Sequence, residues 1–256
     1  MRINIIGAGR VAYHLAQILS KQHQIQQVLS RNLTHAERIA SQVGAMAIDQ
    51  YHQLHAAELC VIAVSDQAIA AVAQAVSEVL PDCILVHTSG STALQKLPQQ
   101  HRDIGVVYPL QTFSFESHID WKNTPIFVEG NSEETLQMLQ ELAQQISERV
   151  YAYNSEQRLS LHLAAVFACN FSNYCYDMAK QIVDAQQVDF SLLHPLILET
   201  ARKATLHDPV TVQTGPAARA DQNILNMHQA LLQQRQDLQQ VYHLLSEQIM
   251  HRQTQA

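Results

Sequence analysis

A glycine-rich turn near the start of the chain has the residue types and spacing that hold a nucleotide diphosphate. Residues 7–12 read Gly-Ala-Gly-Arg-Val-Ala and lie between an apolar run at 2–6 and a helical pattern at 11–22. The first glycine permits a tight turn, the second lets the backbone approach the diphosphate, and the alanine lets the helix pack closely on the strand. The N–H groups at the helix start then face the anion. We expect dinucleotide binding rather than a merely structural turn, with contacts from Gly7, Ala8, Gly9, Arg10 and Val11.

The end of the second apolar run indicates which dinucleotide binds. Sites for NAD place an Asp or Glu there to hold the ribose 2′-hydroxyl. This chain instead has Ser30, Arg31 and Asn32, with no acid nearby. A guanidinium pairs with a 2′-phosphate, and the serine and asparagine add donors. The sequence therefore favours NADP(H), although an exposed arginine at an ordinary strand end is the alternative.

Polar residues at other predicted strand ends and on a later helix could act on a substrate, because ligands of doubly wound sheets bind beyond the carboxyl ends of the strands. We expect His87 and His162 to face this crevice, where either could exchange a proton near neutral pH. Asn170 follows His162 by about two helical turns and shares its helix face. Each has a structural alternative: a loop contact for His87, a core histidine for His162, and a buried amide for Asn170. Further expected contacts are Val64 and Ser65 for the cofactor, and Ser89, Tyr108, Gln111 and Arg219 for the substrate.

These residues require an α/β scaffold, which the hydrophobic pattern predicts. Apolar runs alternate with helical patterns, and fully apolar strands separated by helices indicate a doubly wound, mostly parallel sheet. The expected strands are 2–6, 25–30, 45–48, 59–64, 84–87, 104–108, 125–129 and 149–153, and the expected helices between them include 11–22, 34–43 and 69–80.

The pattern after residue 154 is entirely helical. Long helical stretches at 156–187, 190–206 and 221–253 contain no convincing strand. We therefore expect a Rossmann-type α/β domain at 1–154 and a helical domain at 155–256. The apolar faces of the long helices exceed what one small domain buries, so a homodimer through these helices is also expected.

Composition excludes several other classes. The formal net charge is −7, with no run of Lys or Arg, so we expect neither nucleic acid nor a membrane surface as a partner. No stretch approaches the roughly 18 apolar residues of a membrane span. The four cysteines form no CxxC pair and indicate buried free thiols in the cytoplasm. His52 and His55 lack a third ligand, so no metal site is expected.

The motifs together resemble one known group. They are the glycine turn, Ser-Arg-Asn at 30–32, Ala-Val-Ser-Asp at 63–66, His-Thr-Ser-Gly at 87–90, Tyr-Pro-Leu-Gln-Thr-Phe at 108–113 and Gly-Pro-Ala-Ala-Arg-Ala-Asp at 215–221. Over nearly its whole length the chain resembles the bacterial family of Rossmann-like NADP oxidoreductases with an uncharacterised helical C-terminal domain (the DUF2520-type family). It is more distantly similar to pyrroline-5-carboxylate reductase, ketopantoate reductase and the β-hydroxyacid dehydrogenases.

The chain departs from these relatives at three positions. The family tends to have His where Tyr108 stands and Gly where Ala220 stands, so a glycine-only conformation is not expected at 220. The β-hydroxyacid dehydrogenases place a catalytic lysine one helical turn before an asparagine. Here the position before Asn170 is Val166, so that acid/base lysine is missing.

Two functional hypotheses follow. The first is an NADPH-dependent reductase of a small 2-oxo acid or of a cyclic imine carrying a carboxylate, with Arg219 as the bidentate carboxylate ligand. The second is a noncatalytic NADP(H)-binding sensor or interaction protein. Hydride transfer between NADP and a deazaflavin is a further enzymatic alternative. Convergence of His87, His162, Asn170 and Arg219 would favour an enzyme.

Overall fold

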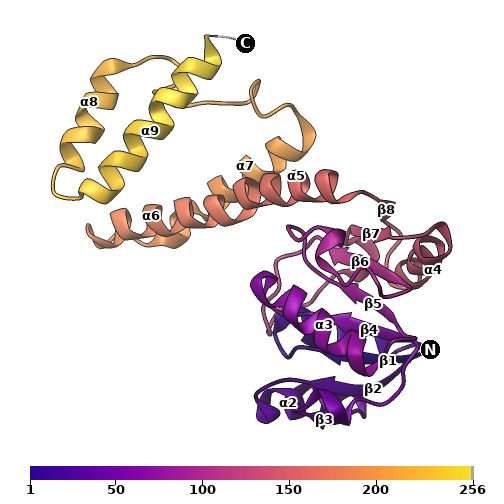
Figure 1. Ribbon diagram of the computed structural model, residues 1–256. Coiled ribbons are helices and arrows are strands. Elements are labelled where there is room, and N and C mark those ends of the chain that lie inside the picture. Colours follow the sequence, from indigo (N-terminus) through magenta and orange to yellow (C-terminus); the bar gives the residue numbers. More distant parts are fainter. Residues whose placement is uncertain (255–256) are drawn as a thin grey trace. The chain divides into compact units, whose positions relative to one another are not determined.

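The computed structural model describes residues 1–254, which divide into two compact units at Asn170/Phe171. Within the described residues, eight strands form one sheet in the order β3-β2-β1-β4-β5-β6-β7-β8 (Figure 1). All neighbouring strands are parallel except β6 and β7. This confirms the predicted α/β class with a mostly parallel sheet. The strands are β1 (Arg2–Ile6), β2 (Gln24–Leu29), β3 (Met46–Ile48), β4 (Leu59–Ile62), β5 (Ile84–His87), β6 (Ile104–Pro109), β7 (Ile126–Gly130) and β8 (Val150–Ala152).

Helices cover both faces of the sheet, as the apolar strands require. On β1, Ile3 and Ile5 pack in one core cluster together with Leu15 of the first helix, whereas Ile6 belongs to a second cluster that contains Ile69. Successive side chains of a strand point to opposite faces, so a strand covered on both sides is mostly apolar. The buried exception in β1 is Asn4, whose Nδ2 donates to the His55 carbonyl (2.8 Å). The helices of this unit are α1 (Arg10–Leu19), α2 (Leu33–Val43), α3 (Ile69–Val79), α4 (Glu133–Gln144) and α5 (Ser155–Ala165), with 3₁₀ helices at Tyr51–Gln53, Asp66–Ala68, Leu94–Lys96 and Trp121–Asn123.

The strand order creates a binding crevice next to β1. Its neighbours are β2 on one side and β4 on the other, so the chain winds away from β1 in opposite directions. The connections that follow β1 and β4 leave the sheet in opposite directions, and a crevice remains between them at the carboxyl ends of these strands. The turns after β1, β2, β4 and β5 therefore meet at one edge of the sheet.

The expected domain boundary at residue 154 is wrong, because α5 is fastened to the sheet by a buried arginine. Arg158 is only 1% exposed and pairs with Glu129 of β7. Its Nε donates to the Ser89 carbonyl (3.2 Å) in the loop after β5. A buried guanidinium is stable only when its donors are matched in this way. The first compact unit consequently continues to Asn170, through a π-helical segment (Val166–Phe171).

The second unit is helical, as expected, but its last stretch is two helices. It contains α6 (Ser172–Asp184), a 3₁₀ helix (Phe190–Leu193), α7 (His194–Leu206), α8 (Gln222–Leu231) and α9 (Gln236–Gln253). The break before α9 contains neither Gly nor Pro, so the sequence pattern did not indicate it. Arg235 at the break pairs with Asp237 and donates to Gln181 of α6 (2.6 Å), which explains the chain reversal by tertiary contacts.

The backbone at Ala220 contradicts the expectation drawn from its side chain. Its φ is +53°, in the left-handed region that favours glycine. The next residue, Asp221, caps α8: its side chain accepts from the Ile224 N–H (3.3 Å), and its own N–H donates to the Pro216 carbonyl (2.9 Å). The tight turn before the helix therefore imposes this conformation even without a glycine.

Within residues 1–254 no helix combines the length and the apolar character that crossing a bilayer requires. Cys60 and Cys83 are buried free thiols, whereas Cys169 and Cys175 are more accessible.

Candidate functional site

The glycine turn has the geometry that a diphosphate needs. Gly7 has φ +119°, and a Cβ there would lie 2.2 Å from the carbonyl oxygen of Ala63. Gly9 has open space around its Cα and is the N-cap of α1 without a side-chain cap. The first N–H groups of α1 are therefore available to an anion. Ala12 is fully buried, which gives the close helix–strand packing expected for a dinucleotide site.

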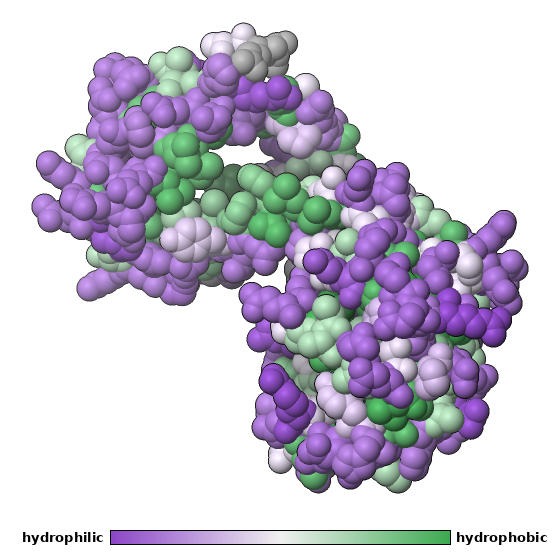
Figure 2. Space-filling model, in the orientation of Figure 1, coloured by the Kyte–Doolittle hydropathy of each residue, from purple (hydrophilic) through white to green (hydrophobic). Residues whose placement is uncertain are grey.

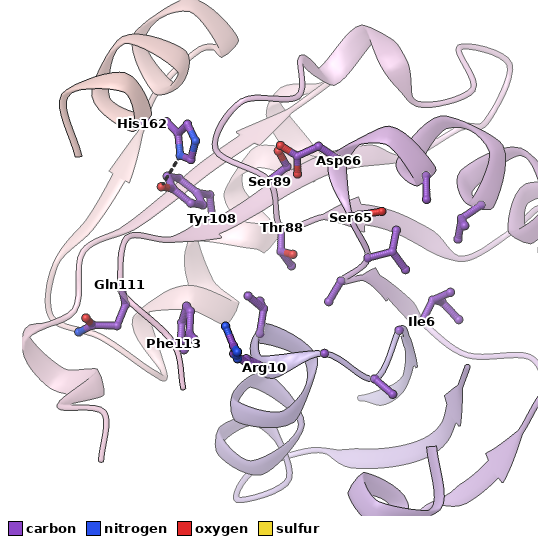
Figure 3. A pocket seen from close by; sticks show the side chains of 18 of the residues that line it. Ile6, Arg10, Ser65, Asp66, Thr88, Ser89, Tyr108, Gln111, Phe113 and His162 are labelled. Carbon is purple, nitrogen blue, oxygen red and sulfur yellow. Dashed lines mark hydrogen bonds between the residues drawn. The ribbon is translucent and has the colours of Figure 1, made fainter. Parts of the chain in front are cut away.

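A large pocket extends from this turn across the carboxyl ends of the strands (Figure 3). Its volume of about 1640 Å³ exceeds that of a site for one small ligand and has room for a dinucleotide and a substrate. All lining residues belong to the first unit. They include these sequence-predicted residues: Gly7, Ala8, Gly9, Arg10, Val11, Ser30, Arg31, Val64, Ser65, Ser89, Tyr108, Gln111, His162 and Asn170.

One end of the pocket suits a 2′-phosphate. Ser30 and Arg31 line it where β2 ends. Asn32, predicted as a further contact, does not line the pocket; its side chain caps α2 by accepting from the His35 N–H (3.3 Å). His35 lines the pocket instead, and sequence reasoning missed it. The available signal was its position one helical turn after Arg31, which puts the two side chains on one side of the helix start.

The other end of the pocket holds a hydrogen-bonded pair. The Tyr108 hydroxyl of β6 and Nδ1 of His162 on α5 lie 3.2 Å apart (Figure 3). A Cβ at Gly90 would lie 2.5 Å from the Tyr108 ring and 2.8 Å from His162 Nδ1, so the pair packs directly on the Gly90 backbone. Burial, with the carboxylate of Asp66 adding to it, raises the pKa of Tyr108 to about 12. Tyr108 is therefore a neutral hydroxyl at physiological pH, able to donate a hydrogen bond.

His87 does not face the crevice, and the expectation that it does is wrong. It is fully buried and does not line the pocket. Its Nδ1 accepts from the Ser89 N–H (3.1 Å), so its proton is on Nε2, which has no well-formed hydrogen bond among the described residues. Burial, and then the positive charge of Arg158, lower the pKa of His87 to about 3. His87 is thus a neutral support for the loop after β5.

That loop is held rigidly beneath the pocket. Ser89 Oγ accepts from the N–H groups of Ser91 (3.1 Å) and Thr92 (2.9 Å), which closes a tight turn. The Ser91 hydroxyl donates to Asp66, which lies in the turn after β4. The Ser89 side chain therefore lines the pocket while stabilising its floor.

The remaining predicted residues are placed in two different ways. Asn170 lines the pocket from the π-helical segment, a type of local irregularity that is frequent at functional sites. Gln111 also lines it, with Oε1 accepting from the Thr112 N–H (2.8 Å). Arg219 is exposed in the second unit and is not among the pocket residues. Of the four residues expected to converge, His162 and Asn170 share the pocket and His87 does not, while Arg219 belongs to the other unit.

Ligands for a metal ion do not gather in the described structure. Across residues 1–254, no three His, Cys, Asp or Glu side chains lie close enough together to hold a metal.

Two family matches together span most of the chain. Residues 2–90 match the family described as "NADP oxidoreductase coenzyme F420-dependent", and residues 124–249 match a domain of unknown function, DUF2520. A search of curated proteins gave no match.

Solved structures share the whole fold. A "putative NADP oxidoreductase" from Bacteroides fragilis is 38% identical, with a TM-score of 0.92 and 98% of each chain covered. A protein from Thermotoga maritima is 23% identical, with a TM-score of 0.74 over 99% of this chain and 98% of that one. An imine reductase from Myxococcus stipitatus in complex with NADP+ is 15% identical, with a TM-score of 0.72 over 98% of this chain and 93% of that one.

Proposed function

The chain belongs to the NADP oxidoreductase family of the Bacteroides fragilis protein, and we propose that it reduces a C=O or C=N bond of a small molecule with NADPH. The observation that carries this proposal is the Tyr108–His162 hydrogen bond, which lies in the same pocket as the glycine turn. A reductase of this kind needs a cofactor site and a proton donor within reach of one substrate.

The chain's own residues supply binding, orientation and the proton. Bound NADPH supplies the hydride. The glycine turn and the start of α1 hold the diphosphate, and Arg31 with His35 suits the 2′-phosphate. Tyr108 donates to the substrate oxygen or nitrogen, and His162 orients the hydroxyl and can return its proton. Asn170, on the same wall, is proposed to orient the substrate.

This assignment replaces the missing lysine with a different donor. Val166 is an apolar part of the pocket lining, one turn before Asn170. Tyr108 reaches the site from the sheet rather than from α5, and its partner His162 comes from the helix. The proposed substrates are 2-oxo acids and cyclic imines, and reduction of a deazaflavin is tested in a separate assay.

The test is NADPH oxidation by the purified protein on a panel of these compounds. Tyr108→Phe removes the donor and is expected to reduce kcat by about 10²–10⁴-fold without changing the NADPH Kd. Tyr151→Phe is the matched control, because Tyr151 is partly exposed and does not line the pocket. Full activity in Tyr108→Phe would refute the assignment of the donor.

We also propose that the protein is a homodimer through its helical unit. Among the described residues of that unit, few apolar side chains are buried, whereas many large ones are exposed, including Leu231 at 75% and Leu198 at 70%. Figure 2 shows such apolar side chains on the visible face of the helices. Apolar patches of this extent mark interaction surfaces. Light scattering after gel filtration should give twice the chain mass, and Leu198→Glu should shift it toward the monomer; a wild-type monomer at micromolar concentration would contradict the proposal.

A further inference from the structure

The charged side chains of the pocket are segregated by sign. Arg10 and Arg31 come from the glycine turn and the end of β2, the segments suited to the phosphates of the cofactor. Asp66 lines the pocket from the turn after β4. In Figure 3 it lies at the same end of the pocket as Ser89 and the Tyr108–His162 pair. The two arginines are matched to phosphates of the cofactor. The charged side chain that remains to face a substrate at this end is the Asp66 carboxylate, which is negative.

The charge of Asp66 is not neutralised by a neighbour. Its carboxylate accepts a hydrogen bond from Ser91 Oγ, and within residues 1–254 it takes part in no ion pair. The buried cation Arg158 is paired with Glu129 instead. The field of Asp66 reaches Tyr108, where it raises the pKa of the hydroxyl by more than the positive charge of Arg158 lowers it.

The wall opposite the sheet is apolar. Between residues 161 and 170, His162 is the only side chain of the pocket lining that can carry a positive charge. Most of the other side chains of this wall are apolar and suit the hydrocarbon part of a substrate. These are Leu161, Ala164, Ala165, Val166 and Ala168.

A carbonyl and a protonated imine make opposite demands on this site. Hydride addition to a carbonyl builds negative charge on oxygen, and proton transfer from Tyr108 would leave a phenolate near the Asp66 carboxylate. Like charges in one site disfavour each other. A protonated imine is a cation before the hydride arrives, so Asp66 attracts it, and no proton has to leave Tyr108 during the step.

We propose that the substrate is an iminium ion, a protonated C=N compound without a carboxylate, bound at Asp66; this inference rests on the proposed function. The iminium carbon accepts the hydride with its two electrons, and the π pair of the C=N bond becomes the lone pair of nitrogen. A neutral amine forms while NADPH is oxidised to NADP+, so atoms and charge balance. As the lone pair forms on nitrogen, the Tyr108 hydroxyl can donate a hydrogen bond to it and keep its own proton.

The experiment compares three substrates and three proteins. The substrates are a cyclic imine, the same ring bearing a carboxylate, and a 2-oxo acid of equal carbon number. The proteins are the wild type, Asp66→Asn, which keeps an acceptor for Ser91, and Asp82→Asn, a control at an exposed carboxylate outside the pocket. We expect the wild type to prefer the simple imine, and Asp66→Asn to lose about 10–100-fold in kcat/KM for it. Asp82→Asn should match the wild type.

A binding measurement provides a readout that does not depend on turnover. The saturated cyclic ammonium ion, titrated calorimetrically in the presence of NADP+, should bind the wild type at least about tenfold more tightly than Asp66→Asn. The NADPH Kd should be equal in both.

The outcomes separate the inference from the proposed function. A wild-type preference for the carboxylate-bearing ring or the 2-oxo acid would overturn the iminium assignment and leave the reductase intact. Loss of NADPH affinity in Asp66→Asn with unchanged substrate preference would also overturn it, since Asp66 would then serve the cofactor. Absence of NADPH oxidation on every compound would count against the proposed function. The ammonium titration would still decide the inference in that case. Equal Kd values for the wild type and Asp66→Asn would overturn it, and weaker binding to Asp66→Asn would support it.

Discussion

The buried imidazole of His87 should make the protein sensitive to mild acid. In the folded state burial, with the charge of Arg158, lowers the pKa of this side chain to about 3, against 6.5 in the unfolded chain. The folded state therefore favours the neutral form of His87. The contribution of this group to the free energy of unfolding is fully present above 6.5, its pKa in the unfolded chain. It is lost as the pH falls from 6.5 toward 3. From about pH 7.5 to about pH 5 the free energy of unfolding should fall by about 2 kcal/mol through this group alone.

The variant His87→Asn isolates that contribution. The Asn Oδ1 can replace Nδ1 as acceptor of the Ser89 N–H, and the amide does not titrate. Urea unfolding of both proteins at several pH values gives two curves of free energy against pH. The other titrating groups contribute to both curves, so their difference reports His87.

The expected difference is a steeper acid loss in the wild type. Near pH 5.5 wild-type unfolding should take up about one proton more than unfolding of the variant, which corresponds to a slope difference of about 1.2 kcal/mol per pH unit. A loss of stability in the variant that is the same at every pH would reflect packing alone. Parallel curves would therefore refute the claim that His87 is held neutral.

Further predictions concern the pocket and one strained turn. Gly90→Ala should push Tyr108 out of place and reduce kcat by about 10–100-fold, with an unchanged circular dichroism spectrum and NADPH Kd; an active variant would contradict the packing argument. Arg31→Ala should cost about 10–100-fold in NADPH affinity and leave NADH unaffected, with a smaller loss in His35→Asn; equal wild-type affinity for both nucleotides would refute the 2′-phosphate assignment. Ala220→Gly should raise the free energy of unfolding by about 1 kcal/mol, and a decrease in urea melts would show that its backbone is not strained.

The sequence was sufficient for the cofactor half of the site because that half is made by local backbone. A glycine turn between a strand and a helix is encoded in a few adjacent residues, and its partner turn after β2 follows from the same unit. Strands that are covered on both faces appear in the sequence as short, nearly continuous apolar runs, and exposed segments lack such runs. The fold class and the nucleotide were therefore predictable without any long-range contact.

The substrate half was less predictable because it depends on which way strand ends face. His87 is the last residue of β5 and its side chain is buried in the core, while Thr88 and Ser89, in the loop that follows, line the pocket. A shift of one residue thus separates a buried histidine from a pocket residue. The pairing of Tyr108 with His162 joins residues from β6 and α5, and only the folded arrangement brings them to 3.2 Å.

The Arg158–Glu129 ion pair also determines where the chain can be divided. A fragment ending at residue 154 would retain Glu129 in its partly buried position but lose the guanidinium, together with the donor to the Ser89 carbonyl. Removal of one partner from a buried pair costs about 3–5 kcal/mol, a large share of the stability of a typical domain. A fragment ending at residue 170 keeps the pair, the Tyr108–His162 contact and every residue that lines the pocket. This fragment is expected to unfold cooperatively, and it would allow cofactor affinity to be measured apart from the helical unit.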